Sequence, residues 1–176
     1  FTPNNDGKLV PDLGYHATLI ENKSDHSFDF YSKDGTLYHF DFVNPQIQWK
    51  LAYVEDTNSN RQTLNYDMDA VPAPRLINVT TTDGRQFNFA YAQQKIDRPG
   101  VSNVEALLQS VNGTGGLEIK FTYDKFGNLV AVNPNGRTET FAYSTSETET
   151  YARSLLSSYI DPNGNKTAYL FNKEKF

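Results

Sequence analysis

The sequence predicts an all-β protein in which tandem antiparallel β-hairpins form one curved, continuous sheet. Three observations carry this prediction. Phe and Tyr, which favour strands, supply nearly all of the 14% aromatic content. A turn signal recurs along the chain at intervals of 20 to 32 residues. A large aromatic residue follows each of these turns at the same distance.

Each turn is identified by a glycine or serine and by the aromatic residue seven positions later. The residue before the turn position is Asp, Asn or Gly, which tolerate the positive φ of a tight two-residue hairpin turn. The six pairs are Gly35 with Phe42, Ser59 with Tyr66, Gly84 with Tyr91, Gly116 with Tyr123, Gly136 with Tyr143, and Gly164 with Phe171. The sequence therefore predicts about six hairpins with two-residue turns.

The strands on the two sides of each turn show different spacings of apolar residues. On the strand that follows the turn, a large apolar residue occurs two positions before the closing aromatic residue, as Leu64 does before Tyr66. This period of two predicts a strand with one buried face. Other strands carry Leu-x-x-Val or a close variant, as in Leu51 and Val54. A spacing of three predicts either a bulge or a strand that is covered on both sides.

The chain divides into a lead-in and a repeat region. Residues 1–27 form the lead-in, in which "YHATLI" predicts an extra strand. Residues 28–176 carry the hairpin repeats and are expected to be one continuous unit of a longer chain. The acidic stretch "STSETETYARS" predicts a solvated loop or an extended hairpin.

One insertion fits two secondary structures. It contains "SNVE", a capping-box pattern, and four apolar residues follow at helical spacing. These residues are Val104, Leu107, Leu108 and Val111. The sequence is therefore compatible with a short helix near 103–110 and also with a strand there.

Composition excludes several functional classes. The absence of cysteine removes disulfides, thiolate catalysis and zinc-thiolate sites. A net charge of −5 without a basic run lacks the electrostatic signature of nucleic-acid or anionic-membrane binding. No apolar run approaches the roughly 18 residues of a membrane span. We therefore expect no nucleic-acid partner and no membrane insertion.

The residues predict no catalytic, metal or cofactor site. His16, His26 and His39 lack the spacing of zinc hydrolases, and no Gly-x-Ser-x-Gly motif occurs. "DTNSN" at 56–60 and "DPNGN" at 161–165 resemble the start of a calcium loop but lack its later Gly and Glu. Because Asp and Asn are also favoured in hairpin turns, we interpret both stretches as turns.

The stretch "YDKFGNLVAVNPNGRTETFAY", residues 123–143, resembles the YD repeat of the RHS family. It contains Tyr-Asp, two residues, Gly-x-Leu, a strand, an Asn-Gly turn, a second strand and a closing Tyr. Asp124 is expected to accept hydrogen bonds from backbone amides of its turn, and Gly127 supplies the permissive last position. Tyr123 and Leu129 are expected to pack inward. The structural repeat positions are Tyr123, Asp124, Gly127, Leu129, Gly136, Tyr143, Gly84, Tyr91, Gly164 and Phe171.

The sequence also departs from the YD pattern. Ala92 and Ser144 follow Tyr91 and Tyr143 where the family has Asp, and Ser59 replaces a turn glycine. Phe replaces Tyr at positions 42 and 171.

The resemblance implies a structural function. In the RHS family a long sheet of tandem hairpins spirals into a hollow shell, found in bacterial toxin complexes, secreted polymorphic toxins and teneurins. It implies that this chain is not an enzyme but part of a β-shell that encloses or presents a neighbouring domain. Its partners would be adjacent repeats and a flanking effector or toxin domain. The implied localisation is secreted or at a cell surface, in bacteria.

A second hypothesis is an extracellular carbohydrate-binding or adhesion module. In it, Trp49 and loops at 92–106 and 144–154 face a ligand, because exposed aromatic rings can stack on sugars. Under either hypothesis the unpaired edge strands favour self-association.

Overall fold

The computed structural model describes residues 1–3, 9–43, 48–70, 73–98, 101–145 and 154–171. Within these ranges the chain is all-β, as predicted, and no residue lies in a helix. No helix of the length and hydropathy of a membrane span therefore occurs in them. Thirteen strands form one sheet, in which each strand neighbours those before and after it in the sequence.

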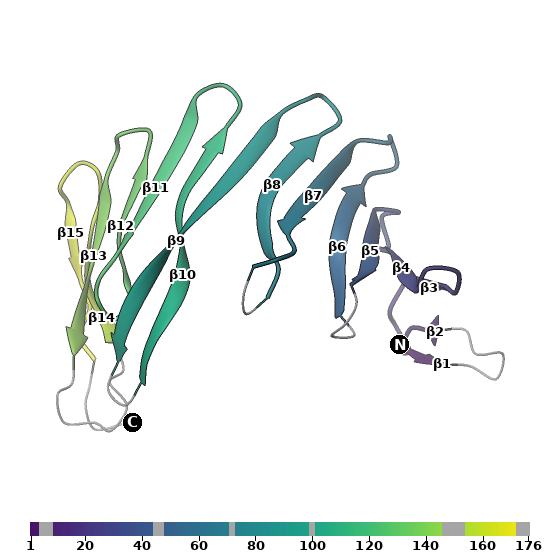
Figure 1. Cartoon of the computed structure of the whole chain (residues 1–176), viewed down its shortest axis with the longest axis horizontal. Coiled ribbons are helices and arrows are strands. Elements are labelled where there is room, and N and C mark those ends of the chain that lie inside the picture. The colour runs from purple at the N-terminus through teal and green to yellow at the C-terminus, as the bar shows by residue number, and fades with distance from the viewer. Residues whose placement is uncertain (4–8, 44–47, 71–72, 99–100, 146–153, 172–176) are drawn as a thin grey trace. The chain divides into compact units, whose positions relative to one another are not determined.

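The chain has two compact units, Phe1–Phe87 and Asn88–Phe176. The strands of the first unit follow one another in sequence order (Figure 1). They are β1 (Thr2–Pro3), β2 (Leu9–Val10), β3 (Thr18–Asn22), β4 (Ser27–Tyr31), β5 (Leu37–Val43), β6 (Gln48–Glu55), β7 (Arg61–Asp67) and β8 (Arg75–Thr81). The predicted extra strand in "YHATLI" is β3, which pairs with β4, whereas β1 and β2 pair only with each other.

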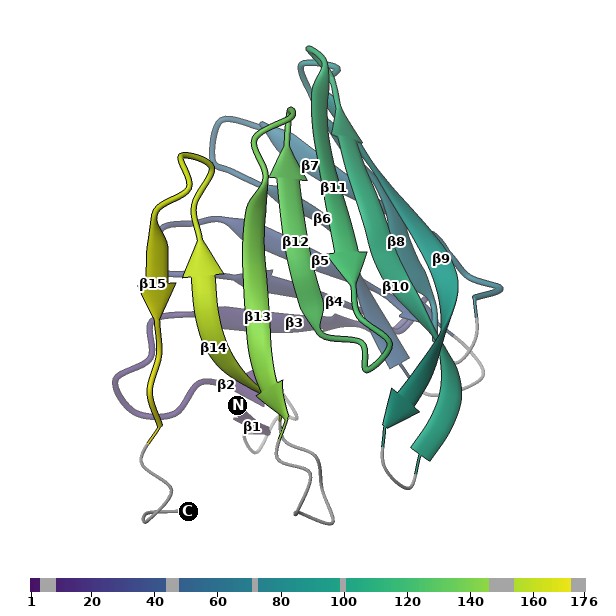
Figure 2. The same ribbon diagram turned by 90° about the vertical axis from the view of Figure 1, so that its left-hand side faces the viewer.

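The second unit continues the same order. Its last five strands lie side by side, which Figure 2 shows face on. The strands are β9 (Gln86–Arg98), which begins in the first unit, β10 (Val101–Gly113), β11 (Leu117–Tyr123), β12 (Leu129–Pro134), β13 (Glu139–Thr145), β14 (Ser154–Ile160) and β15 (Lys166–Ala168). Most of the acidic stretch at 144–154 lies outside the described residues.

The Leu-x-x-Val spacing corresponds to a β-bulge, so one of the two sequence alternatives is confirmed. In the ladder between β5 and β6, Val54 opposes Tyr38 and Leu51 opposes Phe40, which leaves Ala52 as an extra residue. A spacing of three residues on β6 thereby matches a spacing of two residues on β5. The same bulge recurs in three other ladders, with extra residues Ile77 in β7–β8, Val130 in β11–β12 and Ser157 in β13–β14.

At two of the four bulges, the ladder with the next strand also ends. The ladder between β6 and β7 stops at Tyr53 opposite Thr63, immediately after Ala52. The ladder between β12 and β13 stops at Ala131, immediately after Val130. A bulge bends its strand and increases the local twist. It therefore turns one edge of the strand away from the following strand.

Most turns differ from the predicted two-residue type. At 32–36, 56–60, 81–85, 124–128 and 161–165, the first residue's N–H donates to the fifth residue's carbonyl, and the fourth residue's N–H donates to the first residue's carbonyl. Only the fourth residue has positive φ, so these are three-residue loops that end in a left-handed residue. The prediction was therefore wrong for Asp34, Asn58, Asp83 and Asn163, whose φ is not positive.

The Asn135–Gly136 turn is of the predicted type. Both residues have positive φ, at 50° and 84°, and Arg137 N–H donates to the Pro134 carbonyl over 3.0 Å. The turn at Gly115 and Gly116 also has positive φ at both residues.

The short helix near 103–110 is wrong, because this segment is part of β10. The end of β10 is paired with β11, where Val111 opposes Ile119. Val104 is 63% exposed, whereas a helix would place it on the same face as Leu108 and Val111. Pairing with a neighbouring strand therefore outweighs the helical spacing.

Few side chains are fully buried. Strand β11 alternates between half-buried residues, such as Ile119 and Phe121, and exposed ones, such as Lys120. Among the described residues, Ile96 is the one apolar side chain that is buried, at 0% exposure. It lies where β9 contacts the 124–128 turn, because Gln94 Nε2 donates to the Asp124 carbonyl and Asp97 N–H to the Lys125 carbonyl. The sheet thus leaves most apolar side chains only half-covered.

Exchanging the residues at the left-handed turn position tests the loop geometry. Ser59 has φ 64° and Gly164 has φ 87° in equivalent loops. Ser59→Gly is expected to raise the free energy of unfolding by up to roughly 1 kcal/mol, because a non-glycine residue is strained there. Gly164→Ser should lower it by a similar amount. Urea denaturation measures both, and changes of the same sign in the two variants would contradict the assignment.

Candidate functional site

An aspartate clasp organises three of the turns. In the 124–128 turn, Asp124 Oδ1 accepts from the N–H groups of Phe126 (2.8 Å) and Asn128 (2.9 Å), and its Oδ2 accepts from Asn128 Nδ2 (2.9 Å). Asp124 thus binds the backbone amides that the sequence indicated. Gly127 holds positive φ at the fourth position of this turn.

The two stretches that resemble calcium loops have the same clasp. Asp56 binds the N–H groups of Asn58 and Asn60 and the Asn60 side chain, at 2.8 to 2.9 Å. Asp161 makes the same three contacts with Asn163 and Asn165, at 2.7 to 2.8 Å. Their carboxylates are occupied by the turn itself. Among the described residues, no group of three or more His, Asp or Glu side chains could hold a metal ion.

These hydrogen bonds stabilise the ionised carboxylates. The hydrogen bond from the Asn60 side chain, followed by that from the Asn60 backbone, holds the pKa of Asp56 below its usual value. Asn165 lowers the pKa of Asp161 in the same way. In the related turns at 32–36 and 81–85, hydrogen bonds from Ser32 and Thr81 lower the pKa values of Asp34 and Asp83.

The closing tyrosines bind the backbone at the bulges. Tyr66 Oη donates to the Leu51 carbonyl over 3.0 Å, and Tyr143 Oη donates to the Leu129 carbonyl over 2.9 Å. Each acceptor directly precedes the extra residue of a bulge. Burial raises the pKa of both tyrosines, which keeps the hydroxyl protonated as a donor. We call this contact the tyrosine latch.

The remaining repeat positions have structural surroundings. Tyr123 and Leu129 oppose each other across β11 and β12, and both are half-buried. Burial also raises the pKa of Tyr123. Gly84, Gly136 and Gly164 occupy turns with positive φ. Tyr91 is half-buried in β9, and Phe171, which has no hydroxyl to form a latch, is 44% exposed.

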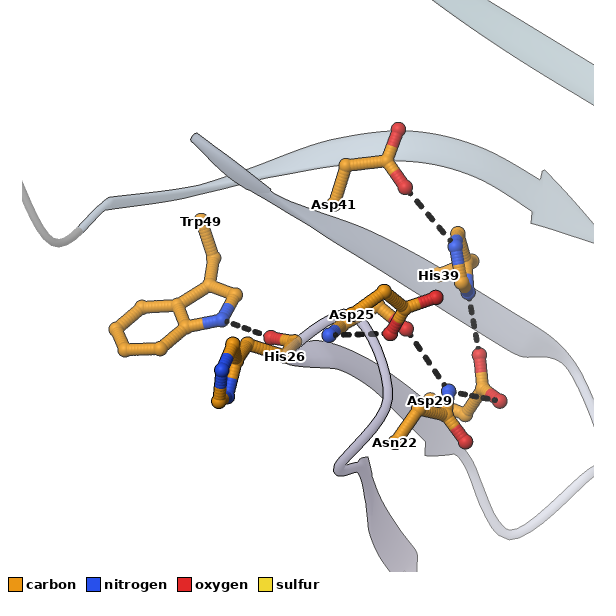
Figure 3. A network of polar contacts seen from close by, with 8 residues as sticks. Asn22, Asp25, His26, Asp29, His39, Asp41 and Trp49 are labelled. Carbon is orange, nitrogen blue, oxygen red and sulfur yellow. Dashed lines mark hydrogen bonds and ion pairs between the residues drawn. The ribbon is translucent and has the colours of Figure 1, made fainter. Parts of the chain in front are cut away.

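A polar network that sequence reasoning missed lies on β3 to β6 (Figure 3). His39 lies between two carboxylates, with Nδ1 2.6 Å from Asp29 Oδ1 and Nε2 3.1 Å from Asp41 Oδ1. Asn22 Nδ2 donates to Asp29 Oδ2 and to Ser27 Oγ, and Ser27 is only 2% exposed. No spacing in the sequence indicated this network, because Asp29 and His39 meet only through the register of β4 and β5.

The network continues across the sheet as a stack. The His39 ring stacks on the Tyr53 ring with 4.7 Å between their centroids, and the Arg61 guanidinium lies over the Tyr53 ring, 3.8 Å from its centroid. Arg61 Nε also binds Glu55 Oε2 at 2.6 Å. Every polar member has a partner within the sheet. The contacts from Asn22 on β3 to Arg61 on β7 link five neighbouring strands, and His39 also binds Asp41.

Trp49 is only partly available to a ligand. Its indole N–H donates to the His26 carbonyl over 2.8 Å (Figure 3), and its ring packs edge-on against Phe28. It is 40% exposed. Residues 92–98 and 101–106, which the carbohydrate hypothesis treats as a loop, belong to β9 and β10, so that expectation was wrong.

The hairpin formed by β6 and β7 borders a groove. It lies where β6 and β7 separate beyond the bulge, and its volume is about 350 Å³. Ala52, Leu64, Tyr66 and Met68 line it together with residues of β5, and Asp41 and Lys50 are its charged lining residues. Its size is at the lower end of the range for ligand sites.

Comparison with protein-family models and with characterised proteins finds no match for this chain.

Removing the latch hydroxyl tests its contribution to stability. Tyr66→Phe and Tyr143→Phe are each expected to lower the free energy of unfolding by about 1 kcal/mol, because a partly buried carbonyl loses its donor. Tyr169→Phe is the control, since Tyr169 is 41% exposed. Urea denaturation measures all three, and an equal effect in the control would contradict the latch.

Acid should weaken the clasped turns. Because the folded pKa values of Asp56 and Asp161 are lowered, their stabilisation is present above the ordinary carboxyl pKa of about 3.9 and is lost as the pH falls through the lowered values. Asp161→Asn should reduce the loss of stability below about pH 4. Asp12→Asn, at an exposed position, serves as the control. Unfolding midpoints at a series of pH values measure this, and identical acid profiles for Asp161→Asn and the parent would contradict it.

Proposed function

We propose that the chain is a non-enzymatic structural segment of an RHS or YD-repeat protein. It forms part of a β-shell wall that encloses or presents a neighbouring domain, such as a toxin. Its partners are adjacent repeats and the flanking domain, and its localisation is secreted or at the surface of a bacterial cell.

The recurrence of one bulged, clasped hairpin carries this proposal. Four ladders share the same bulge, and three turns share the same aspartate clasp. A repeat that stacks only on its neighbours extends in one direction, as a wall does. A binding or catalytic protein needs no such regularity.

The incomplete burial of the sheet supports the same function. Only Ile96 among the described apolar side chains is fully buried, while Ile20, Trp49, Met68 and Ile77 are 40 to 48% exposed. A surface with several partly exposed apolar side chains is typical of one that contacts other parts of the same protein. They disfavour an isolated binding module.

The observations favour the wall over the carbohydrate hypothesis. The Trp49 indole N–H is already bonded to the His26 carbonyl, and part of the region assigned as a ligand-binding loop is strand. The edge positions of β3 and β15 in the sheet fit pairing with further strands, from adjacent repeats or from a second copy.

Limited proteolysis tests the wall function in the polypeptide that carries this chain together with its flanking domains. The double variant Asp124→Ala, Gly127→Val removes both the clasp and the left-handed glycine of one turn. The neighbouring domain should then be cleaved at least about tenfold faster, because cleavage follows the population of the open form. Lys125→Ala, in the same turn, is the matched control.

Two results would contradict the proposal. One is rapid cleavage of the neighbouring domain in the parent protein. The other is full protection in the double variant after circular dichroism has shown a loss of strand signal. Turnover of a substrate by this chain alone would contradict its non-enzymatic character.

A further inference from the structure

The facing edges of β6 and β7 lack ladder partners over half of their length. The ladder stops at Tyr53 opposite Thr63, although β6 extends back to Gln48 and β7 extends on to Asp67. A continued register would pair Ala52 with Leu64 and Lys50 with Tyr66, and neither pair forms. In this stretch, the Leu51 carbonyl accepts the tyrosine latch.

The groove occupies this separation. Its apolar lining residues are Phe42, Val43, Ala52, Leu64 and Met68, and the Tyr66 ring belongs to the same wall. Met68 is 48% exposed. The groove therefore combines an apolar surface with two strand edges that form no ladder pairs with each other in this stretch.

Two opposite charges belong to the lining. Asp41 and Lys50 are directly opposite each other in the β5–β6 ladder, and both line the groove. The Asp41 carboxylate is held by His39 Nε2 at 3.1 Å, and His39 is in turn held by Asp29. Asp41, whose side chain is 63% exposed, is thus an accessible acceptor, and the cationic Lys50 lies opposite it.

The equivalent junction in the second unit differs at several positions, among them the extra residue of the bulge. There the ladder between β12 and β13 also stops at the bulge, and Tyr143 makes the same latch. The extra residue of that bulge is Val130, which is two carbon atoms larger than Ala52. The small side chain of Ala52 leaves room at the first junction.

We propose that this groove binds an extended peptide segment that carries one large apolar side chain. The side chain packs on Leu64, Tyr66 and Met68, and the peptide backbone bonds to the free edges of β6 and β7. A peptide backbone presents donors and acceptors alternately at strand spacing, which suits such edges. Asp41 and Lys50 select a basic and an acidic residue on either side of the apolar one. This site is independent of the proposed shell function.

The single methionine of the chain is a reporter inside the groove. The chain is labelled with ¹³C at the methionine methyl group and titrated with the capped peptide acetyl-Lys-Thr-Leu-Thr-Glu-amide. A saturable shift of the Met68 methyl signal is expected. The same peptide with Ala in place of Leu should bind at least about tenfold more weakly, because the apolar contact is lost.

Two variants assign the shift to the groove. Ala52→Val should weaken binding at least about tenfold by filling the groove, and Val130→Ala, at the equivalent bulge, should leave it unchanged. Valine at position 52 is compatible with the bulge, because Ile77 and Val130 occupy this position elsewhere. Lys50→Glu should also weaken binding, and exchanging the peptide's Glu for Lys should restore it.

Three outcomes would overturn the proposal. The first is the absence of any shift at millimolar peptide while the amide spectrum shows a folded chain. The second is unchanged affinity in both Ala52→Val and Lys50→Glu. The third is a saturable shift caused by N-acetylglucosamine and not by the peptide, which would make the groove a sugar site.

Discussion

The β-bulge after the Leu of four Leu-x-x-Val or similar stretches is the constraint on which the rest of this structure depends. It lets a spacing of three on one strand match a spacing of two on its partner, so that Leu51 and Val54 oppose Phe40 and Tyr38. A bulge also bends its strand. The ladder on the other edge of the same strand consequently stops there, as at Tyr53 and Ala131. One local irregularity thus sets the register of apolar side chains in four ladders and coincides with the end of the next ladder at two of them.

Two side-chain devices compensate for the short ladders. In the aspartate clasp, the carboxylate accepts hydrogen bonds from backbone N–H groups of the turn, as Asp161 does from Asn163 and Asn165. The tyrosine latch supplies a donor to a carbonyl beside the bulge, as Tyr143 does for Leu129. Both use residues that recur at fixed distances along the chain. A hairpin of this kind is stable only beside its neighbours, which connects the local chemistry to a wall that grows by repetition.

The sequence predicted the architecture well because turn residues and alternating aromatics are local signals. It left the bulge as one of two alternatives, since Leu51 and Val54 alone do not reveal which residue of β5 each opposes. The turn type was missed because Asp56 and Asp161 at the first position, rather than Asn58 and Asn163, determine the loop. The helix near Val104 failed because β10 lies between β9 and β11 in the sheet, and these neighbours are not encoded in the spacing of its own apolar residues. The His39 network required the register of three strands, which no spacing in the sequence provides.

The most direct test of this account is a map of cross-strand nuclear Overhauser effects among β5, β6 and β7. The account predicts contacts between the backbone protons of Tyr53 and Thr63 and of Phe40 and Leu51. It predicts none between those of Ala52 and Leu64 or of Lys50 and Tyr66. Continuous backbone contacts from Glu55–Arg61 through to Lys50–Tyr66 would show an uninterrupted ladder. That result would contradict the claim that the ladder between β6 and β7 ends at the bulge.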